Sequence, residues 1–206
     1  MINQFIFVHI LKCGGTTLRT SLFDKKFKKR YLYDSTFKPK RNKLTENDHP
    51  VYVHPQPFPK DYRNFDIIFG HFRYDKYQHL NRPMFSFVRH PVQRMISQYF
   101  YHKKFYERKG KDIGIIEFSS IWKNHQSYVL GNINKFEYIG ITEDFDASLK
   151  LMCQTIGIEP PKRIKKKRVR RKPSLFDKKI RKKIAKMNSD DMELYYKILD
   201  IHKRKL

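Results

Sequence analysis

The chain has 206 residues, of which 39% are hydrophobic and 15% aromatic, and it carries a formal net charge of +25 at pH 7. This length and apolar content predict one globular domain with a sizeable core and exclude a disordered chain. Its two cysteines, Cys13 and Cys153, exclude a disulfide framework, and the surplus of positive charge favours polyanionic partners: nucleic acid, acidic polysaccharide, anionic lipid or a nucleotide.

Strands and helices are expected to alternate along the chain. The predicted elements are, in order, a strand over 5–10, a helix that opens with the hydroxyl residues Thr16 and Thr17 and continues over 18–27, a long connection over 36–64, strands over 65–69 and 84–88, a helix over 91–106, a helix within 113–130, a strand over 136–141, a helix over 144–156, a helix opened by Pro173 or Ser174, and a last helix capped by Ser189. This order predicts an α/β fold, with a central parallel sheet flanked by helices in three layers. We expect a single domain over 1–206, with a basic loop at 160–173 and a C-terminal helical segment at 174–203.

The first predicted strand runs into a six-residue loop, Lys12-Cys13-Gly14-Gly15-Thr16-Thr17. Its glycines allow backbone N–H groups to approach a ligand, the following helix N-terminus adds positive potential, and Lys12 adds a full charge. These features predict an anion site, and the alternative is an ordinary tight turn beside a lysine. The loop is not a Walker A motif, which places its lysine after the second glycine. Cys13 is expected to be a small loop residue, with a reactive thiol as the alternative.

Two more polar sites directly follow predicted strands, Gly70-His71 and Arg89-His90-Pro91. Because the carboxyl ends of parallel strands share one edge, these sites and the Lys12–Thr17 loop are expected to converge on one crevice. The planar guanidinium of Arg89 suits phosphate oxygens, and the hydroxyl of Ser97, two helical turns further on, can join it. The alternative is that Arg94 is a solvated helix residue and Ser97 a packing residue.

These motifs, in this order and spacing, resemble the sulfotransferases that use 3′-phosphoadenosine 5′-phosphosulfate (PAPS). The Lys12–Thr17 loop is similar to the family's 5′-phosphosulfate loop, and Arg89 with Ser97 is similar to its 3′-phosphate site. The closer match is the carbohydrate branch that includes the heparan sulfate 2-O-sulfotransferases. The first motif of that branch, His-x-Pro-Lys-x-Gly-Gly-Thr, compares with His9-Ile10-Leu11-Lys12-Cys13-Gly14-Gly15-Thr16, where Leu11 replaces the proline. The segment Gly70-His71-Phe72-Arg73-Tyr74 resembles the one that supplies the branch's histidine base, and Ile139-Gly140-Ile141-Thr142-Glu143-Asp144-Phe145 resembles a further segment of the family, Gly-x-x-Glu-x-Phe. The resemblance runs from Phe5 to Ile156 and is weaker over residues 30–64.

The resemblance implies a P-loop-like domain that transfers a sulfuryl group from PAPS to a hydroxyl without a metal. His71 would be the general base that takes the hydroxyl proton, and Lys12 would stabilise the departing phosphate. A lone histidine is more often structural, and His9 is expected in the core and His90 in local structure. The implied PAPS contacts are Lys12, Cys13, Gly14, Gly15, Thr16, Thr17, Arg89 and Ser97.

A basic run lies near the C-terminus, Lys162-Arg163-Ile164-Lys165-Lys166-Lys167-Arg168-Val169-Arg170-Arg171-Lys172. From its charge it is a nucleic-acid or heparin-type patch, a solvated segment, or a lid over the nucleotide. In the family that the chain resembles, a basic loop at this place helps to hold the 3′-phosphate and the adenine. We therefore predict a lid that also attracts anionic acceptors, with Arg170, Arg171 and Lys172 as nucleotide contacts.

The implied acceptor is a hydroxyl of a carbohydrate or acidic polysaccharide, with Arg73 and Tyr74 as candidate contacts or else surface residues. A phenol, a lipid-linked sugar and a peptide tyrosine also offer hydroxyls, and nucleic acid is expected to bind only non-specifically. Two other protein classes stay open. A P-loop nucleotide kinase needs Mg²⁺ and an acidic metal ligand at a strand end, which we do not find. A non-enzymatic polyanion- or nucleic-acid-binding protein on an α/β scaffold accounts for the charge alone.

The expected location follows from the apolar segments and the composition. No apolar stretch is long enough to span a bilayer and the first residues lack a signal-peptide layout, so we expect a soluble, cytoplasmic protein. Abundant Lys, Asn, Ile and Phe are typical of an AT-rich genome, as in microbes or viruses.

Overall fold

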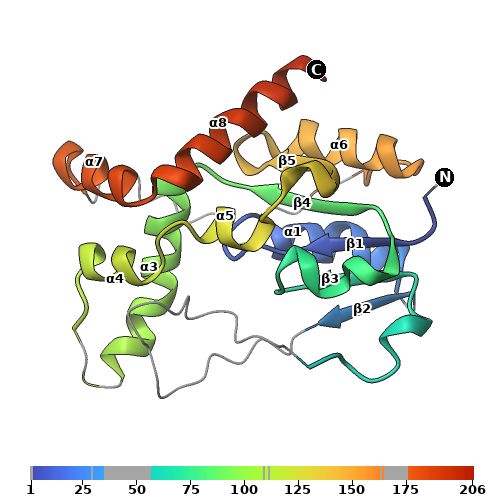
Figure 1. Cartoon of the computed structure of the whole chain (residues 1–206), viewed down its shortest axis with the longest axis horizontal. Coiled ribbons are helices and arrows are strands. Elements are labelled where there is room, and N and C mark those ends of the chain that lie inside the picture. Colours follow the sequence, from blue (N-terminus) through green and yellow to red (C-terminus); the bar gives the residue numbers. More distant parts are fainter. Residues whose placement is uncertain are drawn as a thin grey trace.

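The structure, a computed structural model, describes residues 2–28, 30–34, 57–108, 110, 112–162, 164 and 176–206. The described strands form one parallel sheet of five in the order β2-β3-β1-β4-β5. They are β1 (Phe5–Val8), β2 (Tyr31–Asp34), β3 (Ile67–Gly70), β4 (Met84–Val88) and β5 (Phe136–Ile141). Every pairing between neighbouring strands is parallel, and helices flank the sheet in Figure 1. The predicted α/β fold with a central parallel sheet is confirmed.

The helices connect and cover these strands. They are α1 (Gly15–Leu18), the π-helical turn η1 (Arg19–Phe23), α2 (Asp24–Lys26), α3 (Pro91–Glu107), α4 (Ile115–Ile121), α5 (His125–Leu130), α6 (Phe145–Ile156), α7 (Lys178–Met187) and α8 (Ser189–Arg204). Shorter 3₁₀ turns are η2 (Tyr62–Asn64), η3 (Tyr74–Leu80), η4 (Ile133–Lys135) and η5 (Thr142–Asp144). Helix α7 and the start of α3 lie at the carboxyl ends of the strands, at the left of Figure 1.

The core is built on the central strand β1, all four residues of which are buried. Side chains alternate between the faces of a strand, so Phe5 and Phe7 project to the same side. There they meet Phe23 of η1, with ring centroids 6.0 and 5.8 Å away. Phe7 also stacks on Phe69 of β3 at 5.1 Å. A strand buried on both faces reads as a continuous apolar run, which is why β1 was predictable from the sequence.

The strand order places a topological switch at β1. The chain continues from β1 to β2 and β3 on one side of it, and then to β4 and β5 on the other. In open α/β sheets, ligands bind in the crevice outside the carboxyl ends of the strands at such a point. The fold therefore directs attention to the loop after β1 and to the ends of β3 and β4.

Several predicted boundaries were wrong. Strand β2 was not predicted, because it is a short, half-buried edge strand without an apolar run. The first helix begins at Gly15, the second of the two glycines, directly before the hydroxyl residues that were expected to open it. The single helix expected within 113–130 is two, separated at Asn124, which has a left-handed φ of 51°. Ser189 is the first residue of α8, and Asn188 is the residue that caps it.

The expected opening of α7 at Pro173 or Ser174 was also wrong. The helix begins at Lys178, and the carboxylate of Asp177 caps it by accepting a hydrogen bond from the backbone N–H of Ile180 at 2.7 Å. Pro173 and Ser174 themselves lie outside the described residues. Across the part of the chain that is described, no helix is both long and apolar enough to cross a bilayer.

Candidate functional site

The loop between β1 and α1 has an unusual backbone. Lys12 and Gly14 both have left-handed conformations, with φ of 69° and 78°. Glycine adopts this conformation freely, whereas a lysine there is uncommon and is held by its surroundings. The Nζ of Lys12 lies 4.5 Å from the centroid of the exposed Tyr101 ring of α3, a cation–π contact. The loop thus carries its charge at the carboxyl edge of the sheet, as the anion-site prediction requires.

Gly15 lies against the side chain of His9, the residue directly after β1. An added Cβ at Gly15 would come within 1.7 Å of the His9 Nε2, so a side chain at this position would collide with the ring. The His9 ring is buried and in turn stacks on the His71 ring, with 4.2 Å between centroids. We call Lys12–Thr17 the anion loop, after the site predicted there. The His9 ring thus lies between Gly15 of this loop and the His71 ring. Its burial is consistent with the expectation that His9 belongs to the core.

His71 is placed at the end of β3 with a defined tautomer. Its Nδ1 lies 2.8 Å from the backbone carbonyl oxygen of His9, and because a carbonyl only accepts, Nδ1 carries the proton. The lone pair of the neutral ring is then on Nε2. Burial lowers the pKa of His71 from 6.5 to about 4, with the His9 hydrogen bond and Asp34 opposing this shift. The ring is therefore neutral at pH 7 and can accept a proton at Nε2.

The lowered pKa of His71 predicts how the stability of the fold depends on pH. Between about pH 6.5 and 4 the unfolded chain binds the proton that folded His71 refuses, so the free energy of unfolding falls as the pH is lowered through this window. Burial lowers the pKa of His9 as well and acts in the same direction. Urea unfolding of the wild type and His71→Gln between pH 7 and 4.5 measures the effect. The variant should lose less stability on acidification, and the exposed His79→Gln should behave as the wild type does. Equal slopes for all three proteins would contradict the prediction.

Arg89 is brought next to the anion loop. Its guanidinium Nη1 lies 3.5 Å from the carbonyl oxygen of Lys12, at the limit of a hydrogen bond. Ser97 and Tyr101 are one helical turn apart on α3 and share a face of it, and Tyr101 is the residue that contacts Lys12. Ser97 is half-buried there. The structure thus places Lys12, His71 and Arg89 at one edge of the sheet, with Ser97 beyond them along α3.

Gln126 of α5 connects the loop after β1 with the end of β4, and the sequence analysis did not identify it. Its side-chain amide donates to the carbonyl oxygen of Arg89, and its Oε1 accepts from the backbone N–H of Arg89, both at 2.9 Å. The same Oε1 accepts from the thiol of Cys13 at 3.4 Å. Burial raises the pKa of Cys13 to about 12, so the group stays a thiol, in keeping with a loop residue rather than a reactive nucleophile. A glutamine within a helix gives no sequence signal for such a bridge.

The buried residue Asp191 holds the start of α5, where Gln126 lies, in place. The carboxylate of Asp191 on α8 accepts from the backbone N–H groups of Gln126 and Ser127, at 3.1 and 2.7 Å. It also lies 3.8 Å from the guanidinium of Arg94, which is fully buried. The alternative that Arg94 is a solvated helix residue was therefore wrong, because this charge is enclosed between α3 and α8. A solvated arginine and a buried one look alike in the sequence.

The segment after β5 holds the end of β4. The carboxylate of Glu143 accepts from the backbone N–H of His90 at 2.9 Å, and the hydroxyl of Thr142 donates to the carbonyl oxygen of Val88 at 2.8 Å. Phe145 lies under the anion loop, since a Cβ on Gly14 would come within 2.8 Å of its ring. Residues 142–145 therefore hold the end of β4 and the anion loop in position. This structural role accounts for the Ile139–Phe145 motif without any contact to a ligand.

The two candidate acceptor residues lie beyond His71 and make protein contacts. Arg73 forms an ion pair with Asp75 at 3.2 Å and lies 4.6 Å from the centroid of the Tyr128 ring. Tyr74 packs against Gly131, where an added Cβ would meet its ring at 2.1 Å. Their role as acceptor contacts stays a prediction. The predicted nucleotide contacts Arg170, Arg171 and Lys172 lie outside the described residues.

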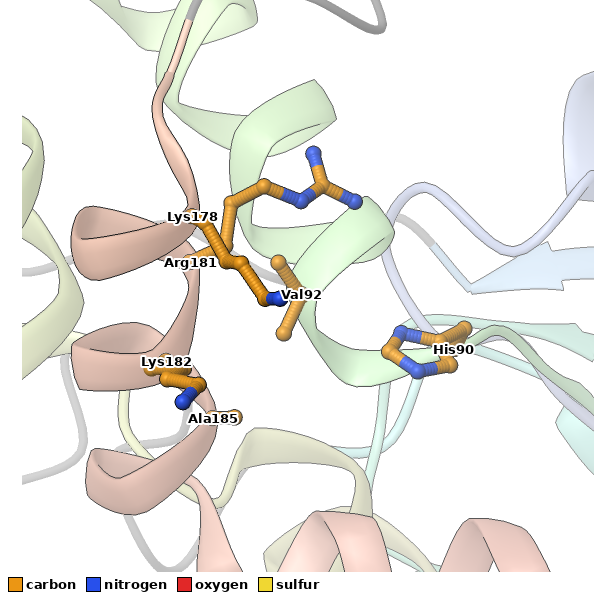
Figure 2. Close-up of a pocket in the computed structure, with 6 residues that line it drawn as sticks. All are labelled: His90, Val92, Lys178, Arg181, Lys182 and Ala185. Atoms are coloured by element: carbon orange, nitrogen blue, oxygen red, sulfur yellow. The ribbon is translucent and has the colours of Figure 1, made fainter.

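A basic groove lies between α7 and the start of α3. Its volume is about 470 Å³, and it is lined by His90, Val92, Lys178, Arg181, Lys182 and Ala185. Figure 2 shows the α7 side chains facing Val92 and His90, with Arg181 extending along α3. Because His90 follows Arg89 directly, the groove extends the positive surface away from the sheet edge. Helix α7, a described part of the basic C-terminal region, thus places Lys178, Arg181 and Lys182 near the carboxyl edge of the sheet.

The described part of the chain holds no cluster of three or more His, Cys, Asp or Glu side chains suited to a metal ion. A reaction without a metal stays a prediction.

A model of the sulfotransferase family matches residues 2–131 of the chain. The fold is similar to the crystal structure of a sulfotransferase from Alicyclobacillus acidocaldarius, at 13% identity and a TM-score of 0.51, over 93% of this chain and 94% of that one. A mouse sulfotransferase, SULT7A1 complexed with PAP, aligns at 14% identity over 94% of this chain and 66% of its own, with a TM-score of 0.38 that is too low to carry an argument. No curated protein matches the chain.

Proposed function

This chain belongs to the sulfotransferase family, and from that premise we propose that it transfers a sulfuryl group from PAPS to a hydroxyl of a carbohydrate, with His71 as general base. The observation that carries the proposal is the state of His71. Its Nδ1–H is donated to the His9 carbonyl, its neutral ring has the lone pair on Nε2, and it stands next to an anion loop. A neutral, oriented imidazole is the group that a hydroxyl nucleophile needs at pH 7.

The residues at the sheet edge suit a nucleotide with two separated phosphates. The anion loop offers backbone N–H groups at the start of a helix and the ammonium of Lys12, and Arg89 offers a planar fork. The left-handed Gly14 opens the loop backbone for close approach. We assign the 5′-phosphosulfate to the loop and the 3′-phosphate to Arg89 and Ser97. When bound, PAPS supplies the sulfuryl group on a phosphate leaving group.

The proposed reaction is a direct displacement at sulfur. The acceptor oxygen forms a bond to sulfur while the bond from sulfur to the phosphate oxygen breaks, and Nε2 of His71 takes the hydroxyl proton. Negative charge grows on the departing phosphate, where Lys12 and the loop N–H groups stabilise it. Positioning and electrostatics supply most of the catalysis, as in phosphoryl transfer. The acceptor is proposed to be a carbohydrate because of the match of the His9–Thr16 and Gly70–Tyr74 motifs to that branch.

Donor binding is tested by thermal unfolding with 3′-phosphoadenosine 5′-phosphate (PAP), the desulfated product, at fixed salt. PAP at 100 times its dissociation constant should add about 2.7 kcal/mol to the free energy of unfolding. A rise in Tm of about 5–10 °C is expected for a domain of this size. ATP with Mg²⁺ is the control and should give a much smaller rise. An equal rise in Tm with both nucleotides would show that the site binds them through charge alone, without specificity for PAP. No rise in Tm with PAP would contradict the proposed function.

A further inference from the structure

Gln126 bonds to the backbone of Arg89 as a neighbouring strand would. Strand β4 pairs with β1 as far as Ser86 and with β5 as far as Val88, so Arg89 follows directly where these pairings end. The side-chain amide of Gln126 then donates to the carbonyl oxygen of Arg89 and accepts from its backbone N–H, both at 2.9 Å. A primary amide offers the same donor and acceptor as a peptide group, so this pair of bonds fixes the Arg89 backbone beyond the end of the sheet.

The same amide also reaches the anion loop. Its Oε1 accepts from the thiol of Cys13 at 3.4 Å, and Cys13 directly follows Lys12. The guanidinium Nη1 of Arg89 returns to this loop and lies 3.5 Å from the carbonyl oxygen of Lys12. The contacts therefore close a ring that runs through Gln126, Cys13, Lys12 and Arg89. The ring holds the distance between the two proposed phosphate sites, because moving either site breaks at least one of its hydrogen bonds.

Gln126 is itself held in one orientation. It is fully buried, and the carboxylate of Asp191, which is also fully buried, accepts from its backbone N–H at 3.1 Å. Directly before α5, the backbone N–H of Asn124 donates to the side-chain carbonyl of the buried Asn188 at 3.1 Å. The start of α5 is thus anchored to the start of α8. An amide on such a support can act as a spacer of fixed length.

We propose that Gln126 is a positioning residue that sets the distance between the anion loop and Arg89, and that it thereby selects a nucleotide with both a 5′- and a 3′-phosphate. In the proposed donor site it contacts neither phosphate and acts through the Arg89 backbone and the Cys13 thiol. Two sites held at a fixed distance favour the ligand whose phosphates have the same separation, because little further ordering is needed on binding. This inference rests on the proposed function and adds to it the residue that makes the donor site selective.

The test compares three nucleotides by titration calorimetry with the wild type, Gln126→Met and Gln126→Asn. They are PAP, adenosine 2′,5′-bisphosphate, which has the same two charged groups at another separation, and AMP, which has the 5′-phosphate alone. The wild type should bind PAP at least about tenfold more tightly than either of the others. In Gln126→Met this preference should fall below about threefold, while the Kd for AMP changes by less than about threefold. Gln126→Asn has a shorter amide, so its preference should lie between, and it carries the test if the methionine variant does not fold.

The matched control is Ser148→Ala on α6. The hydroxyl of Ser148 is fully buried, accepts from the backbone N–H of Ile141 at 2.8 Å and donates to the carbonyl oxygen of Ile141 at 3.0 Å. Ser148 thus does at the end of β5 what Gln126 does at the end of β4. The alanine variant should lower the Tm of the free protein and keep the nucleotide preference of the wild type.

A double-mutant cycle on PAP binding measures the coupling between Gln126 and Arg89. Arg89→Met should weaken PAP binding by about 10- to 100-fold in the wild type and by less than about threefold in Gln126→Met, where Arg89 is already displaced. Equal weakening of all three nucleotides in the Gln126 variants, an unchanged preference, or additive effects in the cycle would overturn the inference. So would a wild type that binds PAP no more tightly than the other two nucleotides. If the wild type does not bind PAP, the proposed function itself is wrong.

Discussion

Replacing His71 with alanine is expected to lower turnover by about 10²- to 10⁴-fold, the range that a positioned general base contributes. The Nε2 of His71 is the proposed acceptor of the hydroxyl proton, and no loop contact to the phosphates depends on it. PAP should therefore raise the Tm of His71→Ala as much as that of the wild type. Initial rates with saturating PAPS, together with the PAP-induced shift, measure the two quantities separately.

Two further variants sharpen this prediction. His71→Gln keeps a side-chain group that can donate to the His9 carbonyl but removes the basic nitrogen, so it should be as slow as His71→Ala. The exposed His79→Ala removes a histidine from the same connection between β3 and β4 and should keep full turnover. Turnover within tenfold of the wild type in His71→Gln would show that another group takes the proton.

Replacing Lys12 with methionine is expected to lower both donor affinity and turnover. Loss of one charged hydrogen bond should weaken PAP binding by about 10- to 100-fold. Turnover with saturating PAPS should fall by about 10²- to 10³-fold, because the ammonium also stabilises the charge that grows on the leaving phosphate. Methionine keeps most of the stem that lies on Tyr101, so changes in packing are small. Rates over a range of PAPS concentrations give both quantities.

The control for Lys12 is Lys150→Met, which removes the same charge from an exposed position on α6. It should change neither PAP affinity nor kcat. A rise in KM for PAPS with unchanged kcat in Lys12→Met would show that Lys12 binds the ground state and transition state equally. In that case the leaving-group role would have to belong to another residue of the loop.

Local patterns were enough to predict which loops meet at the carboxyl edge of the sheet. The apolar run of β1 with the two glycines after it is one short pattern, the polar residues directly after β3 and β4 are two more, and the parallel sheet brings the three together. The buried polar residues that hold these loops in place were not predictable from local patterns. Three of these supporting residues, Gln126, Asp191 and Arg94, contact residues that are 28 to 113 positions away in the sequence. The sequence around a polar residue on a helix gives no sign of which distant residue it will contact. Edge strand β2 was missed for a related reason, because its strand partner β3 begins at Ile67, 36 residues after Tyr31, the residue with which Ile67 pairs.

The contact of Gly15 with His9 has an evolutionary consequence. The same imidazole that leaves no room for a side chain at Gly15 is stacked on His71, the proposed base. A larger side chain at Gly15 would therefore displace the His9 ring and disturb the His71 ring stacked on it, whereas truncating His71 leaves the close approach of Gly15 and His9 in place. Positions 9 and 15 are therefore expected to change together in evolution, because the size of one side chain sets the room that is left for the other.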